Sequence, residues 1–366
     1  MKAGGGASRA WAAAAIGRLD RDAEDVGRTP MRTFPLPPEW GITLYLKDES
    51  AHPTGSLKHR AARAMFRYAI ASGLVTEGTT VVEATGGNAA VAQAYFANLL
   101  GLPYLAVMPG APSPGRSEPV ERLGGGCRFV NPPLAIYEEA RLVAADTGGH
   151  YLDQFTWAER TIDWRGPGLA DELFAQFAER GAAEPAWVVV GAGTGATSAG
   201  LGRYLRYHGA PARLAVVDPE NSAYFPGWVT GAADYATGAP SRIEGIGRPR
   251  MEPGFLPSLV DLVLPVPDAA SVAGARAVRE VTGQSVGGST GTNLWGALEL
   301  IARMRRDGVT GSVVTLIGDA SPRHLHTYHD DRWAEGKGLV DVAACAAAVR
   351  DFRSDGRWRS PSSPSA

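Results

Sequence analysis

Cysteine is scarce in this sequence, with only Cys127 and Cys345 among 366 residues. Two cysteines so far apart lack the ligand spacing of a zinc site, and they are too few for the disulfide framework of a small secreted domain. One disulfide is formally possible, but we expect two buried thiols in a reducing compartment.

The sequence also lacks an excess of either charge. It has 36 Lys and Arg against 38 Asp and Glu, which gives a formal net charge of −2. A balanced chain without a basic stripe argues against a nucleic-acid partner. We therefore expect the partner to be a small molecule.

Long apolar runs are missing as well, since no window approaches the ~18 apolar residues of a membrane span. The alanine-rich run from Ala10 to Ile16 is short, and charged residues follow it directly. We interpret it as a weak helix rather than a signal peptide and expect a cytoplasmic protein. No metal site is expected from the scattered histidines, which are His52, His59, His324, His326 and His329.

Short β-branched runs alternate with longer helical patterns along the chain. The expected strands are residues 44–47, 80–83, 104–108, 128–131, 187–190, 213–217 and 312–317. The expected helices are residues 57–69, 89–100, 134–145, 169–177, 195–207, 270–281 and 291–304. This alternation predicts an α/β fold of mostly parallel sheets flanked by helices.

The length exceeds that of one typical domain, so we expect two lobes. The N-terminal lobe is predicted over residues 1–165, with the first ~40 residues able to pack on the other lobe. The C-terminal lobe is predicted over residues 166–340 and a tail over residues 341–366. The end of the tail, from Arg353 to Ala366, has a composition typical of disorder.

The first chemistry-bearing loop is HPTGSLKHR, which places Lys58 on the first turn of an expected helix. A partly desolvated lysine is suited to Schiff-base chemistry. An isolated lysine is usually a solvated surface residue, but the Pro, Thr, Gly and Ser before this one indicate a specific turn.

The second loop is EATGGNAA, which opens a helix after an expected strand. Its glycines expose backbone amides at a helix N-terminus, where a carboxylate or phosphate binds, and Asn88 is able to donate a hydrogen bond to a phenolate oxygen. Taken alone, the loop fits a plain capped turn equally well.

The third loop is VVVGAGTGATSAG, in which a buried strand runs into glycines and threonines before a helix. This pattern is typical of a phosphate cradle. It also fits a dinucleotide fingerprint weakly, and Asp218 lies about 20 residues further on, so the spacing leaves that alternative open.

The fourth loop is VGGSTGTN, in which Ser289 precedes the last long helix. Its hydroxyl is able to face a heterocyclic nitrogen, although a simple helix cap explains the same residues.

A lysine, an asparagine loop, a phosphate loop and a late serine occur here in the order found in fold-type II pyridoxal-5′-phosphate (PLP) enzymes. From about Val26 to Trp333 the chain resembles the cysteine synthase and cystathionine β-synthase superfamily. Within it, the chain is most similar to the bacterial PLP-dependent L-cysteine desulfhydrases. The segments that carry this likeness are LKDESAHPTGSLKHR, HYLDQFTWAER, DWRG, GRYLRY, VVDPENSAYF, SRIEGIGRPR and GGSTGTNLWGA.

The resemblance implies a two-lobed, tryptophan synthase β-like fold and a role for each loop. Lys58 is expected to bind PLP and to move the substrate's α-proton, and Asn88 to bond the cofactor's O3′. Ser289 is expected to face the pyridine nitrogen, which would leave that nitrogen largely unprotonated. The expected phosphate-binding residues are Gly193, Thr194, Gly195, Ala196 and Thr197. The expected substrate-binding residues are Thr85, Gly86, Gly87, Ala89, Gln154 and Gly245.

Two segments depart from the usual pattern of cysteine synthases. The asparagine loop reads Thr85, Gly86, Gly87, Asn88, Ala89 instead of T-S-G-N-T, so two substrate-holding hydroxyls are missing, each worth about 0.5–1.5 kcal/mol. The segment GDASPRH lacks the expected serine-glycine run. These departures are compatible with PLP binding and favour, as an alternative to the usual substrate, a specialised family member that serves secondary metabolism.

The resemblance implies β-elimination on L-cysteine or a related β-substituted alanine through an aminoacrylate, which yields sulfide, pyruvate and ammonia. The first alternative is β-replacement from O-acetylserine or O-phosphoserine, with Arg116, Arg242 and Arg248 as possible anion contacts. A second alternative is an inactive homologue that only binds a partner or metabolite. The family also implies a homodimer.

Overall fold

The computed structural model describes residues 5–359, and these form two compact units. The first unit contains the chain up to Arg28 together with His52–Ile162. The second contains Thr29–Ala51 and the chain from Asp163 onward. The chain therefore passes between the units at three points.

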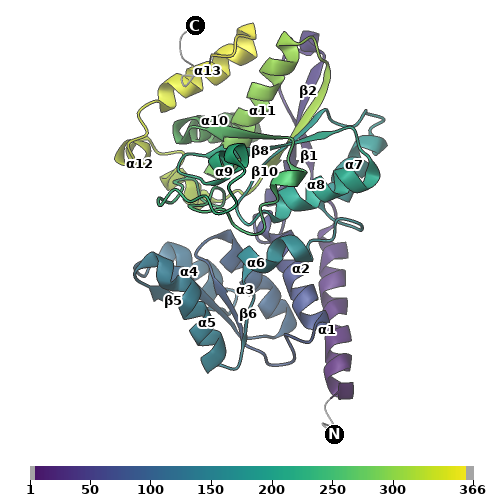
Figure 1. Ribbon diagram of the computed structural model, residues 1–366, viewed down its shortest axis with the longest axis vertical. Coiled ribbons are helices and arrows are strands. Elements are labelled where there is room, and N and C mark those ends of the chain that lie inside the picture. Colours follow the sequence, from purple (N-terminus) through teal and green to yellow (C-terminus); the bar gives the residue numbers. More distant parts are fainter. Residues whose placement is uncertain (1–4, 360–366) are drawn as a thin grey trace. The chain divides into compact units, whose positions relative to one another are not determined.

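The first unit is built on a four-stranded parallel sheet with the strand order β5-β4-β3-β6, of which β5 and β6 are labelled in Figure 1. The strands are β3 (Val81–Ala84), β4 (Tyr104–Pro109), β5 (Gly126–Val130) and β6 (His150–Tyr151). Its helical elements are α1 (Gly5–Val26), α2 (Lys58–Ala71), α3 (Asn88–Leu100), α4 (Pro114–Glu121), η3 (Pro133–Ala135), α5 (Ile136–Asp146) and α6 (Gln154–Thr161).

Strand alternation decides which side chains of β3 meet which helix. Val82 and Ala84 pack with the apolar face of α5, which includes Ala140 and Val143. Successive side chains point to opposite faces of a sheet, so Glu83 lies on the face opposite α5. It is there that Glu83 meets α3.

The second unit is built on a six-stranded sheet with the order β1-β2-β10-β7-β8-β9, parallel except for β1 against β2. The strands are β1 (Met31–Phe34), β2 (Ile42–Asp48), β7 (Trp187–Gly191), β8 (Arg213–Pro219), β9 (Leu262–Val266) and β10 (Gly311–Ile317). The longer helices are α7 (Leu169–Glu179), α8 (Ala196–His208), α9 (Tyr224–Thr230), α10 (Asp268–Thr282), α11 (Gly288–Arg306), α12 (Asp331–Gly336) and α13 (Val342–Asp355). The 3-10 turns are η1 (Pro38–Trp40), η2 (Glu49–Ala51), η4 (Pro257–Leu259) and η5 (Pro322–His326).

Helices cover both faces of this sheet. Val188 and Val190 of β7 belong to a core shared with α7 and α8, whereas Trp187 and Val189 belong to a core shared with α10, α11 and α13. This explains why β7 is apolar along its whole length, as expected for a doubly covered parallel strand.

A glycine contact fixes how closely α10 and α11 cross. A Cβ added to Gly291 would lie 1.8 Å from the carbonyl oxygen of Ser271, and one added to Gly274 would lie 2.3 Å from the carbonyl oxygen of Gly291. Only glycine at both positions permits this approach of the two backbones.

The buried start of the second unit is held by polar groups. Lys47 Nζ lies 2.5 Å from Glu172 Oε1 and donates to the Thr29 carbonyl at 2.7 Å. The Thr29 amide donates to the same carboxylate at 2.7 Å. These bonds tie Thr29 and β2 to α7, which gives Thr29 a structural role.

The expected α/β architecture is confirmed, and every expected strand and helix is present with shifted ends. Strands β1, β6 and β9 were not expected. The expected disorder is wrong for residues 353–358, because Arg353 lies within α13 and Trp358 packs against Trp295 at 4.7 Å. Residues 360–366 lie outside the described part of the chain.

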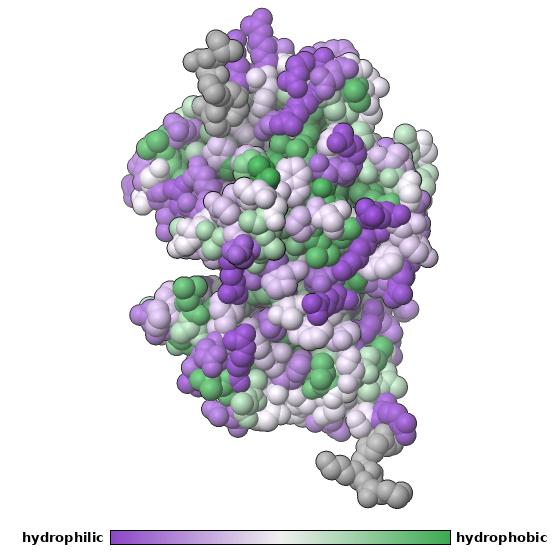
Figure 2. Space-filling model, in the orientation of Figure 1, coloured by the Kyte–Doolittle hydropathy of each residue, from purple (hydrophilic) through white to green (hydrophobic). Residues whose placement is uncertain are grey.

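Both cysteines are free thiols, as expected, but only Cys345 is buried; Cys127 is half-buried. Hydrophilic and hydrophobic residues are interspersed over the face seen in Figure 2, in line with the balanced composition. Within residues 5–359, no helix combines the length and the apolar character needed to cross a membrane.

Candidate active site

Lys58 is the first residue of α2 and is half-buried. The preceding loop turns at Gly55, whose φ of +70° strains any residue but glycine. The neighbouring His59 anchors the turn, because its ring stacks on His52 at 4.8 Å and packs against Phe96 of α3 at 4.7 Å. The position of Lys58 is thus fixed by the buried histidine next to it.

The same histidine connects α2 to α1. His59 Nε2 lies 3.4 Å from Asp22 Oδ2, and the Tyr95 hydroxyl donates to Asp22 Oδ1 at 2.6 Å. The burial of the Tyr95 phenol raises its pKa to about 12, so this hydroxyl stays a donor at neutral pH. No sequence pattern predicts this contribution of α1.

The asparagine loop, residues 85–89, joins the carboxyl end of β3 to α3. The Thr85 amide donates to the Val107 carbonyl at 2.9 Å, and Asn88 is the first residue of α3. No acidic residue lies in the first turn of α3, so its amides and positive dipole end are suited to an anion.

The packing around Gly86 also favours glycine at this position. A Cβ at this position would come within 3.1 Å of Pro109 Cδ and 3.6 Å of Arg116 Nη1. A serine here would need Pro109 to shift by a few tenths of an ångström. The packing of Pro109 therefore also disfavours a serine hydroxyl at position 86.

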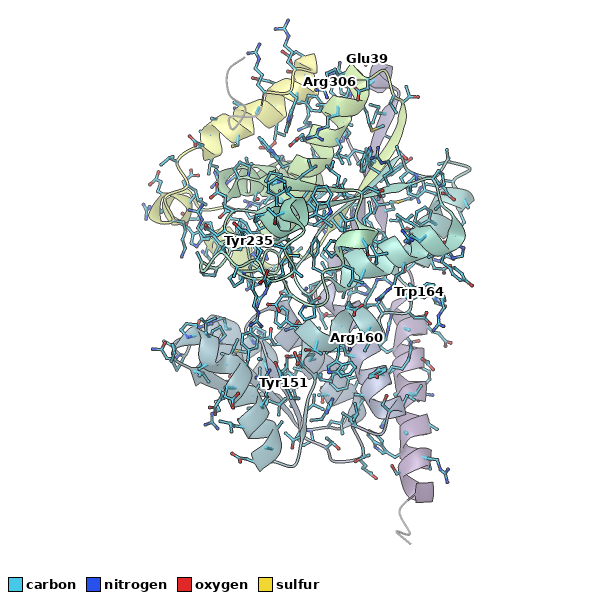
Figure 3. The ribbon with its side chains drawn as sticks, viewed as in Figure 1. Glu39, Tyr151, Arg160, Trp164, Tyr235 and Arg306 are labelled. Atoms are coloured by element: carbon cyan, nitrogen blue, oxygen red, sulfur yellow. The ribbon has the colours of Figure 1, made fainter. Side chains whose placement is uncertain are left out.

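Gln154 is the first residue of α6 and is 6% exposed. It follows β6, the parallel neighbour of β3, so the sheet brings Gln154 and the asparagine loop to the same edge. Tyr151 of β6 precedes it in the sequence and Arg160 of α6 follows it, and both are labelled in Figure 3. The predicted substrate-binding residues before residue 160 are thus gathered within the first unit.

Glu83 is a buried carboxyl group that the sequence did not single out. It is 0% exposed, and it accepts hydrogen bonds from Gln93 Nε2 at 3.0 Å, from the Ala84 amide at 2.9 Å and from the Gln154 amide at 3.2 Å. Burial is the main cause that raises its pKa to about 8.

The phosphate loop, residues 193–197, lies in the second unit between β7 and α8. Gly195 has φ +81°, and a Cβ there would lie 1.9 Å from the Gly254 carbonyl oxygen. A Cβ on Gly193 would lie 2.3 Å from the carbonyl oxygen of Gly245. Both glycines are therefore required by close backbone approach, and the structure places Gly245 against the phosphate loop.

Tyr224 stabilises the phosphate loop through a hydrogen bond to its backbone. Its hydroxyl donates to the Gly193 carbonyl at 2.5 Å, and its ring stacks on Phe255 at 4.2 Å. Burial raises the pKa of Tyr224 well above its ordinary value, so the phenol remains a donor. The SAYF segment contributes to the family resemblance, but nothing in it predicts this contact with Gly193.

Ser289 lies in the first turn of α11 and is half-buried. The next residue, Thr290, accepts a hydrogen bond from the Gly318 amide at 3.0 Å, directly after β10. Because β10 and β7 are parallel neighbours, the serine loop and the phosphate loop lie at the same edge of the second sheet.

The GDASPRH segment is built into this same region. A Cβ on Gly287 would lie 2.3 Å from Asp319 Oδ1, so the loop before Ser289 packs directly on that carboxylate. Asp319 Oδ2 lies 2.8 Å from Nε2 of the buried His324. An Asp-His pair therefore occupies the place where a serine-glycine run was expected.

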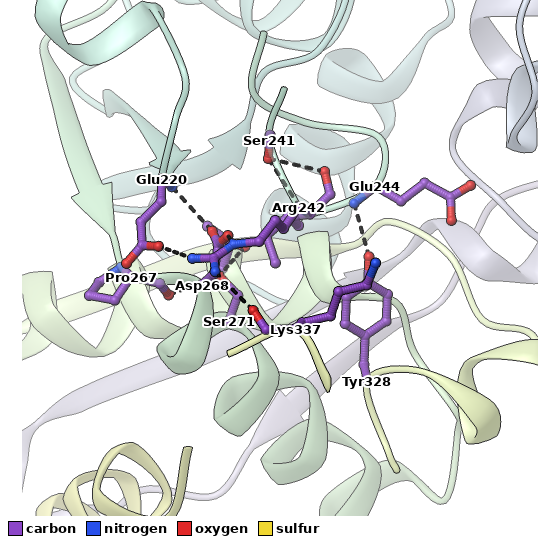
Figure 4. Close-up of polar contacts among 11 residues, drawn as sticks. Glu220, Ser241, Arg242, Glu244, Pro267, Asp268, Ser271, Tyr328 and Lys337 are labelled. Carbon is purple, nitrogen blue, oxygen red and sulfur yellow. Dashed lines mark hydrogen bonds and ion pairs between the residues drawn. The ribbon is translucent and has the colours of Figure 1, made fainter. Parts of the chain in front are cut away.

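Arg242 and Arg248, considered as contacts for a phosphorylated substrate, are already ion-paired. Arg242 Nε donates to Asp268 at 2.7 Å, and its guanidinium also contacts Glu220 (Figure 4). Arg248 Nη2 lies 3.1 Å from Glu252. These pairs fix the segment that carries Gly245 and leave both cations neutralised.

Arg116 lies beside the asparagine loop and donates to the carbonyls of Pro109 and Ala111 at 2.8 and 2.9 Å. Neither acceptor is charged, so among the three arginines it alone shows no ion pair in the described contacts. Its guanidinium lies over the Phe129 ring at 5.3 Å.

A dinucleotide site would need an acidic residue that binds a ribose, and Asp218 is not available for that role. Asp218 is 1% exposed, and its carboxylate accepts the Phe225 amide at 2.7 Å, which caps the start of α9. A carboxylate used in this way is not presented to a ribose. No group of three or more potential metal-ligating residues was found among residues 5–359.

The donor set of the phosphate loop fits the phosphate group of PLP. It combines the amides at the start of a 13-residue helix with the hydroxyls of Thr194 and Thr197, and the first turn of α8 carries no acidic residue. The glycines that flank it are packed so tightly that no side chain can enter.

The chain belongs to the family of pyridoxal-phosphate dependent enzymes, whose model matches residues 23–318. PLP is therefore its cofactor. It is 52% identical over 356 residues to the L-cysteine desulfhydrase Cds1 of Mycobacterium tuberculosis (strain ATCC 25177 / H37Ra), a match that covers 96% of each chain.

More distant relatives have other activities in their names. Cysteine synthase 1 of Emericella nidulans is 28% identical, with 86% of each chain covered. Among solved structures, a hydrogen sulfide-producing enzyme in complex with an α-aminoacrylate intermediate is similar with a TM-score of 0.71 and 25% identity, covering 85% of this chain and 91% of that one.

Proposed function

We propose that the protein is a PLP-dependent L-cysteine desulfhydrase. The reaction breaks the Cβ–S bond of L-cysteine and, with one water, yields hydrogen sulfide, pyruvate and ammonia. The observation that carries this proposal is the 52% identity to L-cysteine desulfhydrase Cds1 across 96% of both chains.

When bound, PLP supplies an electron sink for the charge left at the substrate's α-carbon. We assign Lys58 to hold the cofactor and to move the α-proton through its Nζ, and Asn88 to bond the cofactor's O3′. Gly193, Thr194, Gly195, Ala196 and Thr197 are assigned to its phosphate. Ser289 is assigned to the ring nitrogen, where a hydroxyl leaves the nitrogen largely neutral.

We assign the substrate carboxylate to the first unit. The Thr85 hydroxyl, the amides of Gly86, Gly87 and Ala89, and the Gln154 side chain are the proposed ligands, supported by the shared sheet edge and the dipole of α3. Gly245 is assigned to the segment that lines the substrate's path. Orientation of the α-proton toward Lys58 follows from fixing the carboxylate.

The ion pairs of Arg242 and Arg248 favour a substrate without a phosphate, so L-cysteine is preferred to O-phosphoserine. β-Replacement remains the competing reaction, as the cysteine synthase relative indicates. We also propose that the enzyme works as a homodimer in the cytoplasm; light scattering after size-exclusion chromatography tests the dimer.

The deciding experiment supplies L-cysteine to the purified holoenzyme and measures sulfide and pyruvate together. Equal amounts of both are expected. Sulfide without pyruvate, or consumption only of O-acetylserine with added sulfide to form cysteine, would replace elimination by β-replacement.

A further inference from the structure

Glu83 lies where three segments of the proposed substrate site meet. Its Oε1 accepts the Ala84 amide, one residue before Thr85. Its Oε2 accepts both the side-chain amide of Gln93 on α3 and the backbone amide of Gln154 on α6. One carboxyl group therefore connects the strand that enters the asparagine loop, the helix that leaves it, and the helix that carries Gln154.

The side chains that make these contacts are buried, so each hydrogen bond replaces one that water would otherwise provide. Glu83 is 0% exposed and Gln93 is 1% exposed, and the Tyr104 hydroxyl donates to Gln93 Oε1 at 3.0 Å. A buried polar group is costly unless it is bonded, and removal of its partner leaves the other group unsatisfied. An apolar residue at this position of β3 would leave the buried Gln154 amide without its hydrogen-bond acceptor.

We propose that Glu83 is a positioning residue that holds Gln154 and the asparagine loop in the arrangement that binds the substrate carboxylate. The inference rests on the proposed function, which places that carboxylate on these segments. Glu83 acts through them and does not itself touch the substrate.

Glu83→Gln is the informative substitution. Both oxygens of the ionised carboxyl group accept a backbone amide, whereas a glutamine has one oxygen and one NH2 group, so the two proteins are compared above pH 8, where Glu83 is ionised. In either orientation one of the two amides, Ala84 or Gln154, faces a donor and loses its bond. The side chain keeps its size, and no cavity is created.

The matched control is Tyr104→Phe. It removes one hydrogen bond from the same buried network but leaves every bond of Glu83 in place. A general loosening of the first unit would affect both variants alike, whereas positioning of the substrate site would affect only Glu83→Gln.

The test measures kcat and KM for sulfide release from L-cysteine by the holoenzyme. We expect Glu83→Gln to raise KM about tenfold, which corresponds to one lost hydrogen bond of ~1.4 kcal/mol. We expect kcat to change less than threefold and the visible absorption of the bound cofactor to stay as in the wild type. Tyr104→Phe should leave KM unchanged.

Hydrogen–deuterium exchange provides a second readout that does not depend on turnover. Glu83→Gln should speed exchange in peptides that contain Ala84 or Gln154. Wild-type KM or wild-type exchange in a folded Glu83→Gln protein would overturn the inference. If the wild type releases no sulfide, the proposed function fails instead, and the exchange result still decides whether Glu83 positions these segments.

Discussion

Lys58 is the residue on which the proposed chemistry depends most directly. Its place at the first turn of α2 is fixed by the stacked pair His52 and His59. We predict that Lys58→Ala abolishes both sulfide release and the visible absorption of covalently held cofactor, because no other amine stands at this turn.

The control is Lys337→Ala, an exposed lysine whose carbonyl, not its side chain, contacts Arg242. This variant should keep the activity and the spectrum of the wild type. Sulfide release by Lys58→Ala at the wild-type rate would remove Lys58 from the mechanism.

Glu83 also gives the protein a measurable dependence of stability on pH. Its pKa rises from 4.5 in the unfolded chain to about 8 in the folded one, mainly through burial, with Asp153 adding to the effect. The folded state then holds the proton more tightly, so the contribution of Glu83 is complete below pH 4.5 and is lost as the pH rises toward 8.

We therefore predict that the free energy of unfolding of the wild type falls between pH 5 and pH 8 relative to that of Glu83→Gln, by several kcal/mol at about 1.4 kcal/mol per unit of pKa shift. Urea titrations at several pH values measure this difference. Tyr104→Phe should keep the wild-type slope, since Tyr104 and the nearby Tyr151 stay protonated over this range; their pKa values are raised by burial. Parallel curves for wild type and Glu83→Gln would show that Glu83 does not titrate there.

At the scale of elements, the crossing of α10 and α11 depends on glycine. A methyl group at Gly291 would enter the backbone of α10, since its Cβ would lie 1.8 Å from the Ser271 carbonyl oxygen. We predict that Gly291→Ala lowers the free energy of unfolding by about 1–3 kcal/mol, the usual cost of overpacking. Thermal or urea denaturation measures it.

Gly115→Ala is the matched control, because it lies in α4 with no atom within 4 Å of the added Cβ. It should be neutral or stabilise the protein by about 0.5–1 kcal/mol, as alanine replaces glycine in a helix. Equal effects of the two substitutions would contradict a role for close helix packing.

Most elements could be predicted from periodicity, and the reasons for the misses are local. β6 has only two residues, too few to show an alternation, and β9 contains a proline. β1 was missed because its MRTF segment has polar residues between two buried ends. α13 was assigned to the tail, although Phe352 and Val349 form a buried stripe against the core.

The candidate site likewise contains parts that could be predicted from the sequence and residues that could not. Its glycine loops could be predicted because each has a distinctive sequence beside a strand. Glu83 and Tyr224 could not, since each bonds a backbone group distant in sequence, and such a contact leaves no spacing pattern. Asp319 could not either, because its bond to the buried His324 has no characteristic sequence motif. Arg242 was considered for an anion, and only the structure places Asp268 beside it.

At the scale of the whole molecule, cofactor binding should stabilise the fold. A ligand that binds only the folded state at 100 times its Kd adds about 2.7 kcal/mol. We predict that removal of PLP lowers the melting temperature by several degrees and that added PLP restores it. Calorimetry of apoenzyme and holoenzyme tests this, with pyridoxal lacking the phosphate as the control. Equal restoration by both compounds would contradict the assignment of the phosphate loop.

The pairing of β2 with β10 has a consequence for synthesis on the ribosome. Ile42 pairs with Gly311, 269 positions later, so β2 emerges long before its parallel partner exists. At typical translation speeds this interval is roughly 15–50 s. Until then β2 has β1 on one side and an open edge on the other. The nascent chain thus carries an unpaired strand that a chaperone is suited to shield, and the second unit can close its sheet only near the end of translation.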